Sequence, residues 1–446
     1  MSWRNAEKIE FLGGRRIMKK LTAMLLCLAM LFAFAGCGSK DTGSGSNAGT
    51  AKKGVTEDVL PRLDIKSDVT VPDDFKIGMI CLHDENSTYD NNFIQALKSV
   101  QKGMGLKDEQ VVIVTGIGED SKCYDAAVDL AKNKGCKVIF ADSFGHESFM
   151  KQAAKEFPNV QFCHATGTSG KIAGIANFHN AFASIYEGRY LAGIAAGMKL
   201  NEMIKAGKIK AEEAVIGYVG AYTYAEVISG MTSFFLGARS VCESATMKVR
   251  YTGSWYDQGK EQEAATALIE KDKCVLISQH ADSLGAPTAC ELAGVPNVSY
   301  NGSTYSAGKN TFIVSSAINW APYFQYIIEC AVKGQAIDSD WCGDIATNSV
   351  VISGLNQGVA AEGTEAKLKE AIDAFKAGTL KVFATDKFTV DGKKLDQYMA
   401  DIDGDFKGDT NVIHDGYFDE SNAKSFRSAP YFDIIIDGVT NLNKEV

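Results

Sequence analysis

Short apolar segments alternate with amphipathic segments from residue 75 onward, and this alternation constrains the fold more than any other feature. Parallel sheets covered on both faces contain such nearly continuous apolar strands, with helices between them. The predicted strands form two series, separated by a long predicted helix over 182–203, so we expect two similar α/β lobes. The first series covers 75–82, 111–116, 137–142, 160–166 and 172–178, with helices predicted over 91–103, 123–134 and 147–157. The second series covers 214–220, 247–255, 274–280, 297–301 and 311–316.

The loops after the predicted strands are where we expect a ligand. In an open α/β sheet, ligands lie beyond the carboxyl ends of the strands, and two facing lobes place both sets of loops at one cleft. Trp255 lies at such a strand end, within TGSWYDQGKEQEAATALIE (252–270). A ring that faces the cleft can stack on a flat ligand, whereas an aromatic residue at a strand end can also close the core. The residues alone leave both interpretations of Trp255 open.

The N-terminal region has the pattern of an export signal. Lys19 and Lys20 precede an uninterrupted apolar run over 21–35. This run is shorter than the about 20 residues that a membrane-spanning helix needs. It leads into FAGC, which resembles a bacterial lipoprotein cleavage site, so Cys37 is the predicted lipid-bearing residue. An ordinary signal peptide with a coincidental cysteine is the alternative.

The predicted organisation before the folded part follows from this signal. We assign residues 1–37 to the signal peptide with its lipoprotein cleavage site, but 1–17 have no secretory character, so we expect translation to start at Met18. Gly, Ser and charged residues follow, and we predict a flexible linker over 38–70. A lipid on Cys37 places the protein on the outer face of the cell membrane, anchored to the membrane without spanning it.

Composition narrows the expected partners and the redox chemistry. The formal net charge of −9 gives no support to binding of nucleic acid or of an anionic membrane surface. Of eleven cysteines, nine remain once Cys27 is removed with the signal and Cys37 is assigned to the lipid. Most of these nine lie within predicted strands or helices and none forms a CxxC pair. We therefore expect buried free thiols rather than disulfide bonds.

Motifs for catalysis, cofactors and metals are weak. The sequence has no GxSxG, HExxH or Walker-type loop, and GYVGAY (217–222) has only two glycines of a dinucleotide fingerprint. DIDGDFKGD (401–409) resembles a calcium loop but has Phe406 in place of the required glycine. His280 and Asp282 could form a catalytic pair, yet a hydrogen-bonding pair for a bound ligand explains them equally well. We expect no enzyme activity, no cofactor and no metal.

Six stretches of the sequence resemble the basic membrane protein family of ABC-transporter substrate-binding lipoproteins. They lie between Lys76 and Gly334 and cover 144–167, 186–197, 236–241, 253–269, 277–283 and 318–324. The resemblance implies the type I periplasmic-binding fold, in which two doubly wound parallel-sheet lobes are joined by a hinge. It implies a first lobe over 71–181 plus about 318–348, and a second over 182–317 plus about 349–446. It also implies a monomer that binds a purine and works with an ABC permease and ATPase.

The same resemblance implies roles for individual residues. In the nucleoside binders of the family two aromatic rings sandwich the base, and the matching positions are Tyr89 and Trp255. Hydrogen bonds to the ligand are then expected from further residues near the strand ends, each of which could instead cap a helix or hold a loop. These residues are Asn86, Asp90, Ser143, Gln279, His280, Asp282 and Asn301.

One departure from the family pattern bears on the ligand. Where nucleoside binders have a lysine that holds the ribose, this chain has Asn319, and QHADSLG (279–285) replaces the accompanying glycine-rich loop. Both changes resemble the branch that takes a free purine base such as adenine, so we expect a nucleobase receptor. A nucleoside receptor and a surface sensor of the same fold are the alternatives. Past Val350 the chain departs from the family pattern, and 383–418 is predicted as an added strand–loop unit of unassigned role.

Overall fold

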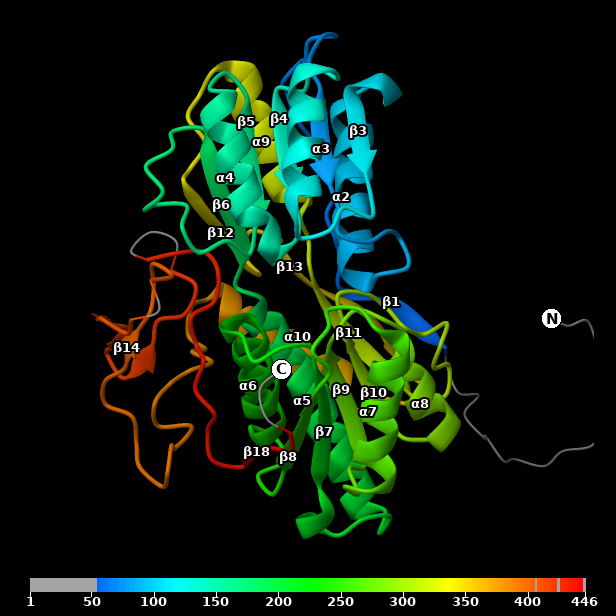
Figure 1. Cartoon of the computed structure of the whole chain (residues 1–446). Coiled ribbons are helices and arrows are strands. Elements are labelled where there is room, and N and C mark those ends of the chain that lie inside the picture. The colour runs from blue at the N-terminus through cyan, green and yellow to red at the C-terminus, as the bar shows by residue number, and fades with distance from the viewer. Residues whose placement is uncertain (1–53, 406, 423–425, 444–446) are drawn as a thin grey trace, which may run out of the picture. The chain divides into compact units, whose positions relative to one another are not determined.

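A computed structural model describes residues 54–405, 407–422 and 426–443 (Figure 1). The predicted signal peptide, Cys37 and the first part of the predicted linker lie outside these residues. Two sheets organise the described part of the chain, one of six strands and one of eight. In both sheets the strands of the central positions are buried on both faces, as expected for parallel sheets covered by helices.

The six-stranded sheet is fully parallel and forms the core of lobe 1. Helices α2 (Thr88–Met104), α3 (Ser121–Lys132), α4 (Glu147–Glu156) and α9 (Ala321–Lys333) cover its faces (Figure 1). The strands, in sheet order, are β12 (Asp340–Gly343), β6 (Phe178–Ala183), β5 (Gln161–Ala165), β4 (Val138–Ala141), β2 (Ile77–Ile80) and β3 (Val111–Val114).

The eight-stranded sheet forms the core of lobe 2, and only its pairings with β13 are antiparallel. It packs with helices α5 (Ile185–Lys205), α6 (Ala225–Arg239), α7 (Gln258–Glu270), α8 (Gly285–Ala293) and α10 (Thr364–Lys376). The strands, in sheet order, are β1 (Val55–Leu60), β13 (Val350–Asn356), β11 (Phe312–Ile318), β10 (Asn297–Tyr300), β9 (Leu276–His280), β7 (Val215–Gly220), β8 (Thr246–Tyr251) and β18 (Val439–Asn441).

Glycines let α5 and α6 approach closely in lobe 2. A Cβ added at Gly193 of α5 would lie 2.0 Å from the backbone oxygen of Phe234 on α6. A Cβ at Gly237 of α6 would lie 2.0 Å from the backbone oxygen of Tyr190 on α5. Real Cβ atoms do not come this close to backbone, so both positions require glycine. The glycines of YEGRYLAGIAAG and LGARSV therefore have a packing role.

Three connections join the lobes and form the hinge. They are Ser184 between β6 and α5, the pair 319–320 between β11 and α9, and 344–349 between β12 and β13. The backbone N–H of Asn319 donates to Ser349 O (2.8 Å), and that of Ser184 donates to Gly343 O (2.7 Å). These bonds hold the three connections side by side.

Two sequence expectations need correction. Residues 172–178 were expected to form a strand and 182–203 a helix, but the strand is β6 (Phe178–Ala183) and the helix α5 begins at Ile185. Strand β6 was not predicted because His179 and Asn180 interrupt the apolar pattern. Both residues are nevertheless buried and hydrogen-bonded to neighbouring residues. His179 Nε2 lies 2.8 Å from Gln161 Oε1, and Asn180 Nδ2 donates to Glu147 Oε1 (3.0 Å).

The second correction concerns the linker predicted over 38–70. Residues 55–60 form β1 instead, which pairs with β13 at the edge of the eight-stranded sheet. The following segment is bonded to the hinge, because Leu63 N donates to Asn348 Oδ1 and Asn348 Nδ2 donates to Pro61 O (both 2.9 Å). Composition did not reveal this pairing because the bonds are made by the backbone.

The chain after α10 forms an extension, defined here as residues 377–443 without 406 and 423–425. It contains two short hairpins, β14 (Met399–Ala400) with β15 (Thr410–Asn411) and β16 (Ile413–His414) with β17 (Tyr417–Phe418). Its interior is aromatic: the rings of Phe383 and Phe432 stack at 4.4 Å, and Phe418 packs edge-on against Phe432 at 4.8 Å. The extension ends in β18, which joins lobe 2 (Figure 1).

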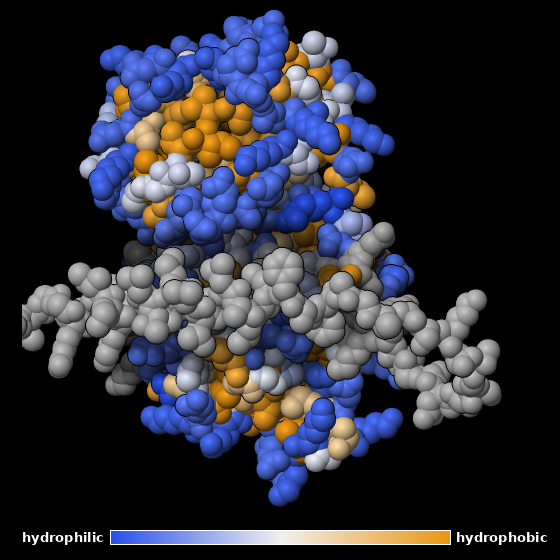
Figure 2. Space-filling model, turned by 90° about the vertical axis from the view of Figure 1, so that its right-hand side faces the viewer, coloured by the Kyte–Doolittle hydropathy of each residue, from blue (hydrophilic) through white to orange (hydrophobic). Residues whose placement is uncertain are grey.

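The surface of the described residues and the state of their cysteines complete the description of the fold. Figure 2 shows a patch of hydrophobic residues on each lobe, bordered by hydrophilic residues. Within the residues that the structure describes, no helix is long and apolar enough to cross a bilayer. The nine cysteines of this part are free thiols, and eight of them are buried.

Candidate ligand-binding site

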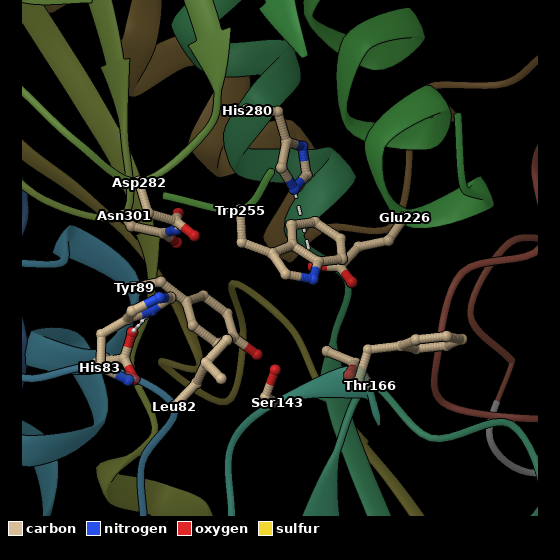
Figure 3. A pocket seen from close by; sticks show the side chains of 12 residues that line it. Leu82, His83, Tyr89, Ser143, Thr166, Glu226, Trp255, His280, Asp282 and Asn301 are labelled. Carbon is tan, nitrogen blue, oxygen red and sulfur yellow. Dashed lines mark hydrogen bonds and ion pairs between the residues drawn. The ribbon is translucent and has the colours of Figure 1, made fainter. Parts of the chain in front are cut away.

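A cavity of about 360 Å³, its open mouth included, lies where the carboxyl ends of the two sheets meet (Figure 3). Each lobe contributes residues from strand ends and from the first turns of the following helices. Lobe 1 supplies Leu82, His83, Tyr89, Asp90, Ser143, Phe144 and Thr166. Lobe 2 supplies Glu226, Trp255, His280, Asp282 and Asn301.

Seven of the ten residues predicted to bind the ligand line this cavity, namely Tyr89, Asp90, Ser143, Trp255, His280, Asp282 and Asn301. The other three do not. Asn86 is exposed and its amide donates to Asp84 Oδ1 (2.9 Å). Gln279 is buried and donates to Ala281 O (3.0 Å). Asn319 is buried in the hinge, where its amide donates to Asn348 O (2.9 Å).

Five further residues line the cavity but were not among the residues predicted to bind the ligand, namely Leu82, His83, Phe144, Thr166 and Glu226. Four of them directly follow β2, β4 or β5 within a few residues, so the rule that ligands lie beyond strand ends could have found them. Glu226 lies in the first turn of α6, after the loop that follows β7, and no motif marks it.

The aromatic rings at the cavity come from opposite lobes. The Trp255 ring packs against Tyr222 and Tyr224, with ring centroids 4.9 and 6.0 Å apart. The Tyr89 ring is fixed by edge-on packing on Phe93 (4.9 Å) and by its hydroxyl, which donates to Asp142 O (2.8 Å). Both rings point into the same space (Figure 3). Each is therefore held in place by its own lobe rather than by the other ring.

The lobes touch each other beside the cavity. The backbone N–H of Thr88, at the start of α2, donates to Asp282 O (2.9 Å), and the Thr88 hydroxyl donates to the same oxygen (3.1 Å). The rings of His83 and Tyr256 lie 5.3 Å apart across the cleft. These contacts join the start of α2 in lobe 1 to the loop after β9 in lobe 2, so the cleft is closed.

Asp282 and Asn301 form a polar pair at the lobe 2 side. Asn301 Nδ2 donates to Asp282 Oδ1 (3.1 Å). The backbone of Asn301 is in the left-handed region (φ 65°). Burial raises the pKa of Asp282 well above its ordinary value, and the charges of Glu261 and Asp90 raise it further. The carboxyl group therefore favours its protonated form, which both donates and accepts hydrogen bonds.

A second polar pair joins His280 and Glu226, whose Nε2 and Oε1 atoms lie 3.7 Å apart (Figure 3). Burial lowers the pKa of His280, although Glu226 acts in the opposite direction. The buried Arg189 stabilises strands β9 and β10 behind this pair, because it donates to Ser278 Oγ (2.9 Å) and to Ser299 O (3.1 Å). Arg189 thus holds the ends of β9 and β10, which present the polar residues.

On the lobe 1 side Asp90 organises the loop after β2. Its carboxylate accepts from His83 N (2.7 Å) and from Ser87 Oγ (2.6 Å). Burial opposes the charge of Asp90, but the hydrogen bonds from His83 and Ser87 outweigh it and lower the pKa. Asp90 is therefore a charged residue whose oxygens are already engaged by the protein.

Two groups of acidic and thiol side chains lie close enough together to hold a metal ion. Cys81, Asp90 and Asp142 lie close together behind the cavity, and Asp401, Asp403 and Asp405 lie in the extension. In the second group the carboxylates hold the turn itself, because Gly404 N donates to Asp401 Oδ1 (2.8 Å) and Asp405 N to Asp403 Oδ1 (3.2 Å). This geometry explains the calcium-like sequence as a turn.

Comparisons with known proteins agree with this architecture. A family model described as ABC transporter substrate-binding protein PnrA-like (Bmp) matches residues 81–376. A putative ABC transporter glucose-binding protein of Haloferax volcanii is 35% identical over 207 residues, which is 46% of this chain and 49% of that protein. A purine-binding protein of Brucella abortus is 32% identical over 252 residues, 56% of this chain and 66% of that protein. The chain thus spans about half of the length of the first relative and about two thirds of the length of the second.

Solved structures show the same fold. A solute-binding protein of an ABC transporter system from Conexibacter woesei superposes with a TM-score of 0.56 at 20% identity, over 69% of this chain and 98% of that one. This likeness confirms the predicted type I periplasmic-binding fold, and the family match confirms the predicted family. The chain belongs to the Bmp family of PnrA-like ABC transporter substrate-binding proteins.

Proposed function

We propose that the protein is the lipid-anchored receptor of an ABC importer and binds a purine base, adenine or a close analogue, between its lobes. The observation that carries the proposal is the position of Tyr89 and Trp255, two rings from opposite lobes that face one cavity. Stacking on aromatic side chains is worth about 1–3 kcal/mol per base and accepts any flat ring. The rings of Tyr89 and Trp255 therefore provide affinity but do not distinguish purines that differ in their substituents.

Selection among purines comes from the polar pair Asp282–Asn301. A protonated carboxyl group presents one donor and one acceptor, and an amide does the same. An aminopurine edge also presents an amino donor beside a ring-nitrogen acceptor, so it complements either group. A site built from such buried groups discriminates against ligands that leave them unpaired.

The charge of the lining argues against a phosphorylated ligand. Glu226 and Asp90 are acidic, and none of the described residues that line the cavity is Lys or Arg. A phosphate group would therefore lie among carboxylates with no cation to balance it. A base or a nucleoside fits this lining better than a nucleotide.

The absence of a ribose-holding lysine favours the base over the nucleoside. Asn319 occupies the position where the family resemblance placed that lysine, and its amide is already bonded within the hinge. Asn319 therefore offers no positive charge to a ribose, unlike the lysine at this position in nucleoside binders. A nucleoside receptor remains the second candidate, because other cavity residues offer hydroxyl and carboxyl groups to a ribose.

The transport role extends beyond the cavity. We infer that the chain carries a lipid on Cys37, lies on the outer face of the cell membrane and acts as a monomer. It passes its ligand to a permease that an ATPase drives, without changing the ligand. A sensor of the same fold would bind the same ligand but would not support uptake.

Isothermal titration calorimetry tests the ligand. The purified protein should bind adenine with one site per chain, and adenosine no more tightly. Glucose belongs in the panel because one relative is described as a putative glucose-binding protein. Binding of adenosine about a hundredfold tighter than adenine would favour the nucleoside receptor, and binding of glucose alone would contradict the purine proposal.

A further inference from the structure

The extension is attached to lobe 2 at its far end. Strand β18 is the edge strand of the eight-stranded sheet and pairs in parallel with β8, the strand that precedes Trp255. Beyond β18, Asn443 forms two hydrogen bonds with the backbone of Tyr251: Tyr251 N donates to Asn443 Oδ1 (2.9 Å) and Asn443 Nδ2 donates to Tyr251 O (2.8 Å). The last described residues of the chain are therefore fixed to the lobe that carries Trp255.

The same extension is attached to lobe 1 through Ser428. Its backbone N–H and its hydroxyl both donate to Asp340 Oδ1, at 2.8 and 2.6 Å. Asp340 lies on β12, and its other carboxylate oxygen accepts from Lys171 N of lobe 1 (3.1 Å). Ser428 and Asp340 are both buried. The extension makes a further contact nearby, because a Cβ at Gly404 would lie 2.6 Å from Thr168 Oγ1.

These attachments lie on the cleft side, next to the ligand cavity. A second, open cavity is lined by residues of lobe 1, lobe 2 and the extension together, and Phe144, Thr166 and Glu226 line both cavities. The extension contributes Asp401, Gly404, Arg427, Ala429 and Pro430 to it. Figure 1 shows the extension in orange and red beside the lower lobe, reaching the lower end of the upper lobe near β12. Apart from β18, the extension thus lies beside the cleft and outside both of these sheets.

Internal hydrogen bonds fix the part of the extension between Ser428 and β18, its two attachments to the lobes. Buried Glu420 accepts from Tyr431 N (2.8 Å) and from Phe432 N (2.7 Å), just after Ser428. Closer to β18, Asp437 N donates to Thr389 O (2.9 Å). The segment between Ser428 and β18 is therefore folded into the aromatic interior of the extension and cannot simply straighten when the lobes separate.

We propose that the C-terminal extension fastens lobe 1 to lobe 2 beside the ligand cavity and thereby slows release of the ligand. Hinged receptors release their ligand by separating the lobes on the cleft side. Here that separation pulls Asp340 away from Ser428, so these two hydrogen bonds must break or the extension must leave lobe 2. The fastening favours the closed form, and a ligand that binds the closed form is held longer. The proposal rests on ligand binding in the inter-lobe cavity.

The test compares Ser428→Ala with wild type, using adenine as the probe. The variant loses the hydroxyl bond to Asp340 and keeps the backbone bond. Release of adenine, followed by stopped-flow fluorescence, should become about tenfold faster, the factor expected for one hydrogen bond to a charged group. Small-angle X-ray scattering of the ligand-free protein should show a larger radius of gyration for the variant. Ser428→Thr keeps a hydroxyl and should restore slow release.

Thr385→Ala is the matched control. Thr385 is buried in the extension and its hydroxyl donates to Gly416 O (3.1 Å), a bond within the extension only. This variant should lose stability without faster release. Wild-type release and an unchanged radius of gyration in a folded Ser428→Ala would overturn the fastening. If adenine does not bind wild type at all, the proposed ligand fails, whereas the scattering comparison still tests the fastening.

Discussion

Replacing Trp255 by alanine tests how much of the affinity comes from stacking. The side chain lines the cavity opposite Tyr89, and no hydrogen bond from its ring to the described residues would be lost. The backbone oxygen of Trp255 accepts from Asp282 N (2.9 Å), and this bond survives the substitution because it involves only main-chain atoms. Trp255→Ala therefore removes the ring and leaves the polar pair Asp282–Asn301 in position.

The expected loss is that of one of two stacking rings. Tyr89 is fixed separately by Phe93 and by Asp142 O, so it continues to contact one face of the purine. Removal of the other ring should cost about 1–3 kcal/mol, or roughly fivefold to 150-fold in Kd. Trp255→Phe should cost less because a flat aromatic face remains.

Calorimetry with adenine measures this loss, and Tyr326→Ala provides the control. Tyr326 is a half-buried aromatic residue on α9 whose ring lies 6.3 Å from that of Tyr323, and it does not line the cavity. Its replacement should lower stability but leave adenine affinity unchanged. If Trp255→Ala binds adenine as tightly as wild type, the ring only packs against Tyr222 and Tyr224, and the stacking argument is refuted.

Three further predictions concern the polar pair, the pH dependence and the packing of lobe 2. Asp282→Asn should keep adenine affinity within a few-fold because a donor and an acceptor remain, whereas Asp282→Leu should bind adenine at least tenfold more weakly. If calorimetry shows that Asp282→Leu binds adenine as tightly as wild type, this carboxyl group has no role in binding. Burial raises the pKa of Glu261 from 4.5 to about 7. The folded state thus holds this proton more tightly than the unfolded state, so the contribution of Glu261 to stability should fall by up to about 3 kcal/mol as pH rises from 4.5 to 7. Denaturant unfolding across this range should show a weaker pH dependence for Glu261→Gln, and an unchanged slope would refute the assignment. Gly193→Ala should destabilise by about 1–3 kcal/mol because its Cβ would meet Phe234 O at 2.0 Å. Gly259→Ala should not, since its Cβ would meet only Asp257 Oδ1 at 3.5 Å; thermal unfolding at similar temperatures for both variants would contradict the packing argument.

The two-lobed architecture could be predicted because buried parallel strands are apolar on both faces. Strand β6 escaped prediction because its buried His179 and Asn180 satisfy their polar groups through neighbours, which a hydrophobicity pattern cannot show. Strand β1 escaped because it is held by backbone bonds to β13, which depend on the fold and hardly on composition.

The site was predictable where a residue type and a strand end coincide, as for Trp255 and Asp282. Glu226 was not predictable in this way, because it reaches the cavity from the first turn of α6, and only the packing of α6 against β9 brings it near His280. Asn319 shows the opposite case: a polar residue near a predicted cleft turns inward to bond the hinge. The role of the extension depends on contacts between distant segments, such as Ser428 with Asp340, that no local pattern contains.

A crystal structure of the protein with adenine tests the central claim most directly. The account predicts that the adenine ring lies between the rings of Trp255 and Tyr89, with one polar edge hydrogen-bonded to Asp282 or Asn301. Adenine bound outside this cavity, or bound within it without contact to either ring, would contradict the account.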